Sequence, residues 1–235
     1  MVYGFVHTDS EPEIQAVADD LPPLVKKNLQ DIEGGYRVDS LRKSHLEAAG
    51  VNPGEVDEIV GAMGRIEYTN DLPDVLDAIS TKRKDWVAEN TTYYNVLEDT
   101  DRDCFLAKDC LTYSVTAEQI SEQKLIGTLT QTFSQEFIWV EHDGHDAVAS
   151  RVLAPDPVDV SSAVVAIDQQ YSFFLIRQLP KGGCERVESM WAEARALSFD
   201  VPDSFAVDTA VSSMGKQAER VDAWIDAGKP KGEGF

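Results

Sequence analysis

Residues 137–153 read FIWVEHDGHDAVASRVL and hold the turn pair Asp143-Gly144 at their centre. Apolar and β-branched residues lead up to this pair over 137–142 and away from it over 147–153. Asp-Gly is a preferred pair in the tight turns of β-hairpins, because such turns need residues that tolerate positive φ. The stretch therefore predicts a hairpin of two antiparallel strands.

Aromatic and β-branched residues are frequent on both sides of this hairpin, which favours further strands. They occur in three segments, 91–94, 105–115 and 126–133. A short helix is expected between them at 116–124. Beyond the linker at 155–157, residues 161–179 fit a buried strand or a helix, and we prefer the strand. Residues 91–180 are therefore predicted to be β-rich and mostly antiparallel.

The two ends of the chain show helical patterns instead. Proline and glycine positions divide residues 1–90 into helices, and the strongest of these runs from Asp71 to about Glu89 with apolar residues three and four apart. The same spacing predicts helices over 185–197 and 202–228. The sequence thus predicts an α+β fold with a helical N-terminal third, a mostly antiparallel β middle and a helical C-terminus over 181–235, as three segments or one continuous domain.

The charge of the chain is strongly one-sided. It has 42 Asp and Glu against 21 Lys and Arg, for a net charge of −21. Like charges oppose the compact state in dilute buffer, whereas in molar salt the Debye length falls to about 3 Å and the repulsion is screened. Because the acid is spread along the whole chain, the composition resembles that of haloarchaeal proteins and predicts a halophilic setting.

The composition does not identify a reaction, and each motif that suggests catalysis lacks a partner residue. We therefore favour a non-enzymatic structural subunit of a multi-protein particle in a haloarchaeal setting, such as a head–tail connector, neck or tail protein of a tailed virus. No cofactor is predicted. Two alternatives stay open: a cytoplasmic haloarchaeal enzyme or metal-binding protein, and a DNA-associated regulator.

The metal-binding alternative depends on the titratable cluster at 141–146. His142 and His145 offer nitrogen ligands that suit Zn²⁺, and neighbouring carboxylates could complete a shell. The cluster falls on the expected tip of the hairpin, where a polar turn needs no other explanation. No second pair of Cys or His in the sequence would close a tetrahedral site. The two histidines are candidates, but no metal is predicted.

A basic run, Lys82-Arg83-Lys84, stands out in this acidic chain. It could contact DNA phosphates or an acidic neighbour, or it could be a solvated helix face. Residues 40–49 and 53–61 have the spacing of a helix-turn-helix, but the second helix would carry Glu55, Asp57 and Glu58. This acidic face would repel DNA, which favours an ordinary helical hairpin.

The last predicted helix has a seam of apolar residues spaced 4, 3, 4, 3 and 4 apart. They are Val207, Val211, Met214, Ala218, Val221 and Ile225. Such a seam can pack against another helix, so a homo-oligomer with further particle proteins as partners is expected. Docking of the seam on its own domain is the alternative.

The expected location is the cytoplasm or a virion. The first residues lack the pattern of a signal peptide, and no apolar run is long enough to span a membrane. Three cysteines provide no disulfide framework and suit a reducing interior.

Overall fold

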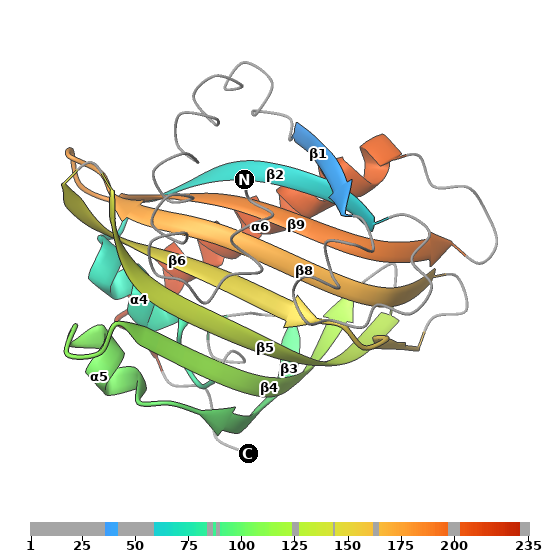
Figure 1. Cartoon of the computed structure of the whole chain (residues 1–235), viewed down its shortest axis with the longest axis horizontal. Helices are drawn as coiled ribbons and strands as arrows, with labels where there is room; N and C mark the ends of the chain where they lie inside the picture. The colour runs from blue at the N-terminus through green and yellow to red at the C-terminus, as the bar shows by residue number, and fades with distance from the viewer. Residues whose placement is uncertain are drawn as a thin grey trace.

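The computed structural model describes residues 36–41, 59–83, 87, 90–123, 127–142, 144–161, 165–196 and 203–230. These residues form one large antiparallel sheet with helices on one face and at one end (Figure 1). The strands are β1 (Tyr36–Leu41), β2 (Ile59–Tyr68), β3 (Thr91–Asp99), β4 (Thr112–Gln123), β5 (Gly127–His142), β6 (His145–Ala154), β7 (Asp159–Val160), β8 (Val165–Gln178) and β9 (Cys184–Ala196). The helices are α4 (Leu72–Ile79), α5 (Arg102–Leu106) and α6 (Asp203–Asp226).

The strand order is β1-β2-β9-β8-β6-β5-β4-β3, with β7 paired to β5. The hairpin predicted over 137–153 lies near the centre of this order. Strands β5 and β6 pair from Ser134 with Leu153 to His142 with His145. Gly144 in the connecting turn has a φ of +74°, a conformation that most side chains disfavour, so the glycine is needed there.

Helix α6 is hydrogen-bonded to segments next to both edges of the sheet. Asp222 accepts hydrogen bonds from the backbone N–H of Thr69 (2.8 Å) and from Asn70 (2.9 Å), just after β2. Arg220, two residues earlier on α6, donates to Asn90 (3.1 Å), just before β3. The sheet therefore curves so that its two sides approach the same helix, which crosses one face of it (Figure 1).

The face turned towards the helices has a densely packed apolar end. Helix α4 buries Leu72, Val75 and Leu76 there. An aromatic cluster of Phe105, Tyr113, Phe137 and Trp139 fills the same end, with ring centroids 5.4–6.1 Å apart. This burial of large apolar surface is the main stabilising contribution that the described core makes to the fold.

The prediction of a helical N-terminal third is wrong for residues 36–41 and 59–68, which the structure describes as strands. These residues form β1 and β2, although 53–61 was expected to be a helix. Strand β2 has neighbours on both sides, and Ala62, Met63 and Ile66 are buried on alternate faces. A strand buried on both faces lacks the polar alternation that marks a half-exposed strand. The helices predicted over the rest of 1–58 lie outside the described residues.

Two further helix predictions are wrong. Cys184–Ala196, most of which was expected as a helix over 185–197, forms strand β9 between β2 and β8, and 116–123 of the helix expected over 116–124 belongs to β4. Burial of both faces explains the error in β9. Val187 and Trp191 on one face of β9 are as buried as Glu188 on the other. The preference for a strand at 161–179 and the helix at 202–228 are confirmed by β8 and α6.

Helix α4 is shorter than the predicted span of 71–89, because α5 supplies groups that end it. Arg102 donates to the carbonyl oxygen of Ser80 (2.9 Å) and to that of Asp77 (2.7 Å). These bonds satisfy carbonyl groups that would otherwise lack partners at a helix C-terminus. No helix in the described ranges is both long and apolar enough to cross a bilayer.

Two of the three cysteines differ from expectation. Cys104 in α5 and Cys110 after it form a disulfide with Cα atoms 5.3 Å apart, while Cys184 is a buried free thiol. The short α-helical turn of α5 brings the two cysteines together, and sequence spacing did not reveal this.

Candidate functional site

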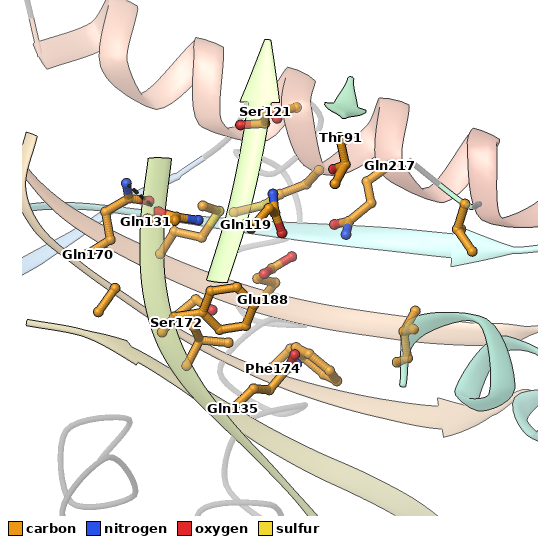
Figure 2. A pocket seen from close by; sticks show the side chains of 18 of the residues that line it. Thr91, Gln119, Ser121, Gln131, Gln135, Gln170, Ser172, Phe174, Glu188 and Gln217 are labelled. Atoms are coloured by element: carbon orange, nitrogen blue, oxygen red, sulfur yellow. Dashed lines mark hydrogen bonds between the residues drawn. The ribbon is translucent and has the colours of Figure 1, made fainter. Parts of the chain in front are cut away.

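A cavity of about 340 Å³ lies between the concave face of the sheet and helix α6 (Figure 2). It begins where the apolar end of the core stops. Sheet residues from β4, β5, β6, β8 and β9 line it, and α6 covers it with Ser213, Met214 and Gln217. Ser213 and Gln217 are exposed, so the cavity opens to solvent beside this helix.

The register of the sheet explains which side chains face the cavity. Gln135, Val152, Ser172 and Met190 occupy paired positions on four adjacent strands and therefore share one face. The next row contains Phe174 paired with Glu188. Each of these residues lines the cavity.

Glutamines are the most numerous polar residues of the lining. They come from β4, β5, β8 and α6 and are Gln119, Gln131, Gln135, Gln170 and Gln217. Figure 2 shows these groups around one central space, with Ser121, Ser172 and Thr91 among them. A carboxamide both donates and accepts hydrogen bonds, so the lining can match either kind of group on a ligand.

A buried ion pair forms one wall of the cavity. Arg186 and Glu188 are each 4% exposed, and the Arg186 guanidinium donates to the Glu188 carboxylate at 2.5 Å. Arg186 also donates to the Tyr68 hydroxyl (3.2 Å) and lies over the Phe174 ring, 4.2 Å from its centroid. The guanidinium is therefore held in one orientation by three neighbours on β2, β8 and β9.

The charge of this wall is fixed by its neighbours. Burial works against the charged form of Arg186, but Glu188 and Tyr68 outweigh burial and raise the pKa of the guanidinium. Burial raises the pKa of Tyr68 despite the nearby positive charge, so its phenol stays neutral. The wall therefore contains one positive and one negative group in contact.

Two of the carboxamides have unused hydrogen-bonding capacity. Within the described part of the chain, the side chains of Gln119 and Gln217 make no hydrogen bond. Gln170 donates to Gln131 at 3.4 Å, which is long for such a bond, and Gln135 donates to Ser150 at 3.1 Å. The cavity therefore offers free donors and acceptors.

The histidine candidates lie away from this cavity. His142 and His145 are paired at the end of the β5–β6 hairpin, the first buried and the second exposed. Among the described residues, no group of three or more potential ligands is placed to hold a metal ion.

The first two residues of the basic run, Lys82 and Arg83, do not lie on a helix. They follow the end of α4, and Lys82 forms an ion pair with Asp99 on β3 at 2.5 Å. Lys84 lies outside the described residues, as does most of the predicted helix-turn-helix; the described end of its second helix is the start of β2.

The seam of the last helix is turned into its own domain. Met214, Ala218 and Val221 belong to the buried core, and Ile225 packs against it. These four residues are therefore core residues and not an exposed oligomer interface, because the sheet of the same chain already covers them. The side chains of Val207 and Val211 are not among those that the structure describes.

Sequence reasoning missed the polar residues of the cavity, and it assigned the lining residues Met214 and Val221 to an oligomer contact. The signal was present as polar residues two or four positions apart, and therefore on one face of a strand: Gln131 and Gln135 in β5, Gln170 and Ser172 in β8, and Arg186 and Glu188 in β9. In β9 this signal was hidden, because Val187, Met190 and Trp191 also fit helical spacing.

Comparisons with known proteins add no family. No family model matches the sequence, and no curated protein matches it. Solved structures that resemble the chain include a START superfamily protein from Mycobacterium smegmatis, with a TM-score of 0.47, 7% identity and coverage of 71% of this chain and 97% of the other. Another is Ara h 8.0201, with a TM-score of 0.42, 6% identity and coverage of 72% and 99%. At these TM-scores the resemblance carries no argument about fold or function.

Proposed function

We propose that this protein binds a small organic molecule in the cavity between its sheet and helix α6. The observation that carries the proposal is the cavity itself: about 340 Å³ in volume, open beside α6, and lined by apolar groups together with carboxamides and a buried ion pair. Ligand sites in proteins are typically concave, largely preformed and lined by apolar groups with a few oriented polar ones.

Filling the cavity tests this proposal. Ser172 lines the cavity from β8, so Ser172→Phe would occupy part of its volume. Ser134 is exposed on β5, and Ser134→Phe is the matched control. A library of small molecules would be screened by NMR in molar KCl, with native mass spectrometry to detect any ligand that copurifies.

We expect ligands that bind the wild type and Ser134→Phe in one-to-one stoichiometry but fail to bind Ser172→Phe. Binding that survives in folded Ser172→Phe would place the ligand elsewhere and reject the cavity. Membership of a multi-protein particle stays a prediction from the sequence, because a cavity within one chain is compatible with an isolated or an assembled protein.

A further inference from the structure

The two ends of the concave face differ in what they could hold. One end is filled by α4 and the aromatic cluster. At the other end, which contains the cavity, polar side chains alternate with apolar ones, as in the pairing of Gln119 with Gln131. Apolar residues such as Phe133, Val152 and Met190 make up about half of the cavity lining.

The charges in the buried wall cancel each other. Arg186 and Glu188 are in contact, so neither is left to neutralise a charge on a ligand. A ligand with a carboxylate or ammonium group buried against this pair would have to break it or remain unpaired, and both are unfavourable in a desolvated site. The third charged residue of the lining, Arg220 on α6, donates to Asn90 at 3.1 Å. The wall therefore favours a neutral ligand.

The carboxamides favour a ligand that can form hydrogen bonds. Gln119 and Gln217 make no side-chain hydrogen bond to any described residue, so in the empty protein water must satisfy them. A hydrocarbon ligand would displace that water without replacing its bonds. A ligand that forms hydrogen bonds with these groups is therefore favoured over one that leaves them unpaired, most of all at Gln119, because Gln217 is exposed and can keep water.

We propose that the cavity selects a neutral molecule with several hydrogen-bonding groups and a short apolar portion, over fatty acids and simple alcohols. This inference rests on the proposed function of small-molecule binding. The hydrogen-bonding groups would lie against Gln119, Gln131 and Gln217, and the apolar portion against Phe133, Val152 and Met190.

Three probes with the same eight-carbon chain test this selectivity. Octyl β-glucoside has a neutral polyhydroxylated head, 1-octanol has one hydroxyl, and octanoate has a charge. Binding would be measured by calorimetry in molar KCl, below the micelle concentration of the glucoside. The variants are Gln119→Leu and Gln217→Leu, and the control is Asn95→Leu, which changes an exposed carboxamide on β3 to a group of similar shape.

We expect the glucoside to bind in one-to-one stoichiometry and about tenfold or more tightly than either other probe, since the site bonds groups that they lack. Both glutamine variants should reduce this preference, and Asn95→Leu should keep it. Equal or tighter binding of octanol or octanoate overturns the selectivity but leaves small-molecule binding intact. Absence of binding by all three probes also overturns it, and the library screen with Ser172→Phe then decides separately whether the cavity binds anything.

Discussion

Arg186 is the residue whose loss should damage the fold most through charge. It is buried and paired with Glu188, so Arg186→Met would leave a carboxylate buried without its partner. Removing one member of a buried pair costs about 3–5 kcal/mol. We expect a loss of this size in the free energy of unfolding, measured by urea denaturation in molar KCl.

The control for this prediction removes both charges. Arg186→Met combined with Glu188→Leu leaves no buried charge at the site, and replacing a whole pair by apolar groups is often neutral or stabilising. The double variant should therefore recover most of the stability. If the single and double variants are equally unstable, packing of the guanidinium on Phe174 matters more than its charge.

The three cysteines should differ in reactivity, so the number that a thiol reagent modifies should depend on whether the protein is folded and whether it is reduced. Cys104 and Cys110 are joined, and Cys184 is buried, which raises the pKa of its thiol. A thiol-specific reagent should modify no cysteine in the folded protein, one after unfolding and three after unfolding with a reductant, as measured by mass spectrometry. Three modified cysteines without reductant would disprove the disulfide.

At the scale of elements, Asp77 joins the three helices. It accepts hydrogen bonds from Arg102 at 2.6 Å and from Lys229, just beyond α6, at 2.6 Å. Burial by itself raises the pKa of Asp77, but Lys229 and Arg102 outweigh it, and the pKa is lowered below 3.8. The stabilisation is therefore fully present above the ordinary pKa of an aspartate and is lost as the pH falls through the lowered value.

Comparison with Asp77→Asn measures this contribution. The wild type should be more stable than the variant at pH 7 by about 1 kcal/mol or less, because the carboxylate is one-third exposed and solvent screens it. The difference should shrink towards pH 3. Asp103→Asn, on the exposed side of α5, is the control and should show almost no such pH dependence.

Helix α6 should be essential for folding and not for association. Val221 is 1% exposed against the core, so Val221→Asp buries an unpaired charge. We expect loss of several kcal/mol and of the circular dichroism of the native state. Ala223→Asp makes the same change at an exposed position of the helix and should remain folded. A folded Val221→Asp protein of reduced native mass would instead support an interface between copies.

At the scale of the whole molecule, the net charge of −21 predicts a requirement for salt. Lowering KCl from molar to millimolar concentration should lower the urea midpoint, because repulsion between carboxylates is then poorly screened. Glu98→Lys with Glu122→Lys, both exposed, should reduce this requirement without changing the core. An unchanged circular dichroism spectrum in millimolar KCl would contradict the halophilic prediction.

Sequence patterns formed by residues close together in the chain correctly predicted two elements, the hairpin of β5 and β6 and the helix α6. The hairpin around Gly144 follows from its turn pair, and α6 follows from a long apolar stripe that ends near Gly228. Strands β2 and β9 could not be predicted in this way, because both of their faces are buried. In such a strand the spacing of apolar residues shows only that they are buried, and it does not distinguish a strand from a helix.

None of the polar residues that line the candidate site was predicted as part of a site, and Met214 and Val221 were predicted only as seam residues for a partner helix. Tyr68 and Arg186 are 118 residues apart in the chain, yet they are hydrogen-bonded in one wall. Each glutamine of the lining, taken alone, is an ordinary polar residue of a strand or helix. Their convergence depends on the register of several strands and on the position of α6.

The sequence by itself determined the charge of this protein, the central hairpin and the C-terminal helix, because each depends on composition or on residues close together in the chain. The tertiary structure alone decided that Arg186 and Glu188 form a buried pair, that five glutamines line one cavity, and that Met214, Ala218 and Val221 of the α6 seam are part of the core. The physical reason is that burial and hydrogen-bond partners are properties of side chains from distant strands, and strand pairing brings these together only when the sheet closes around its helix.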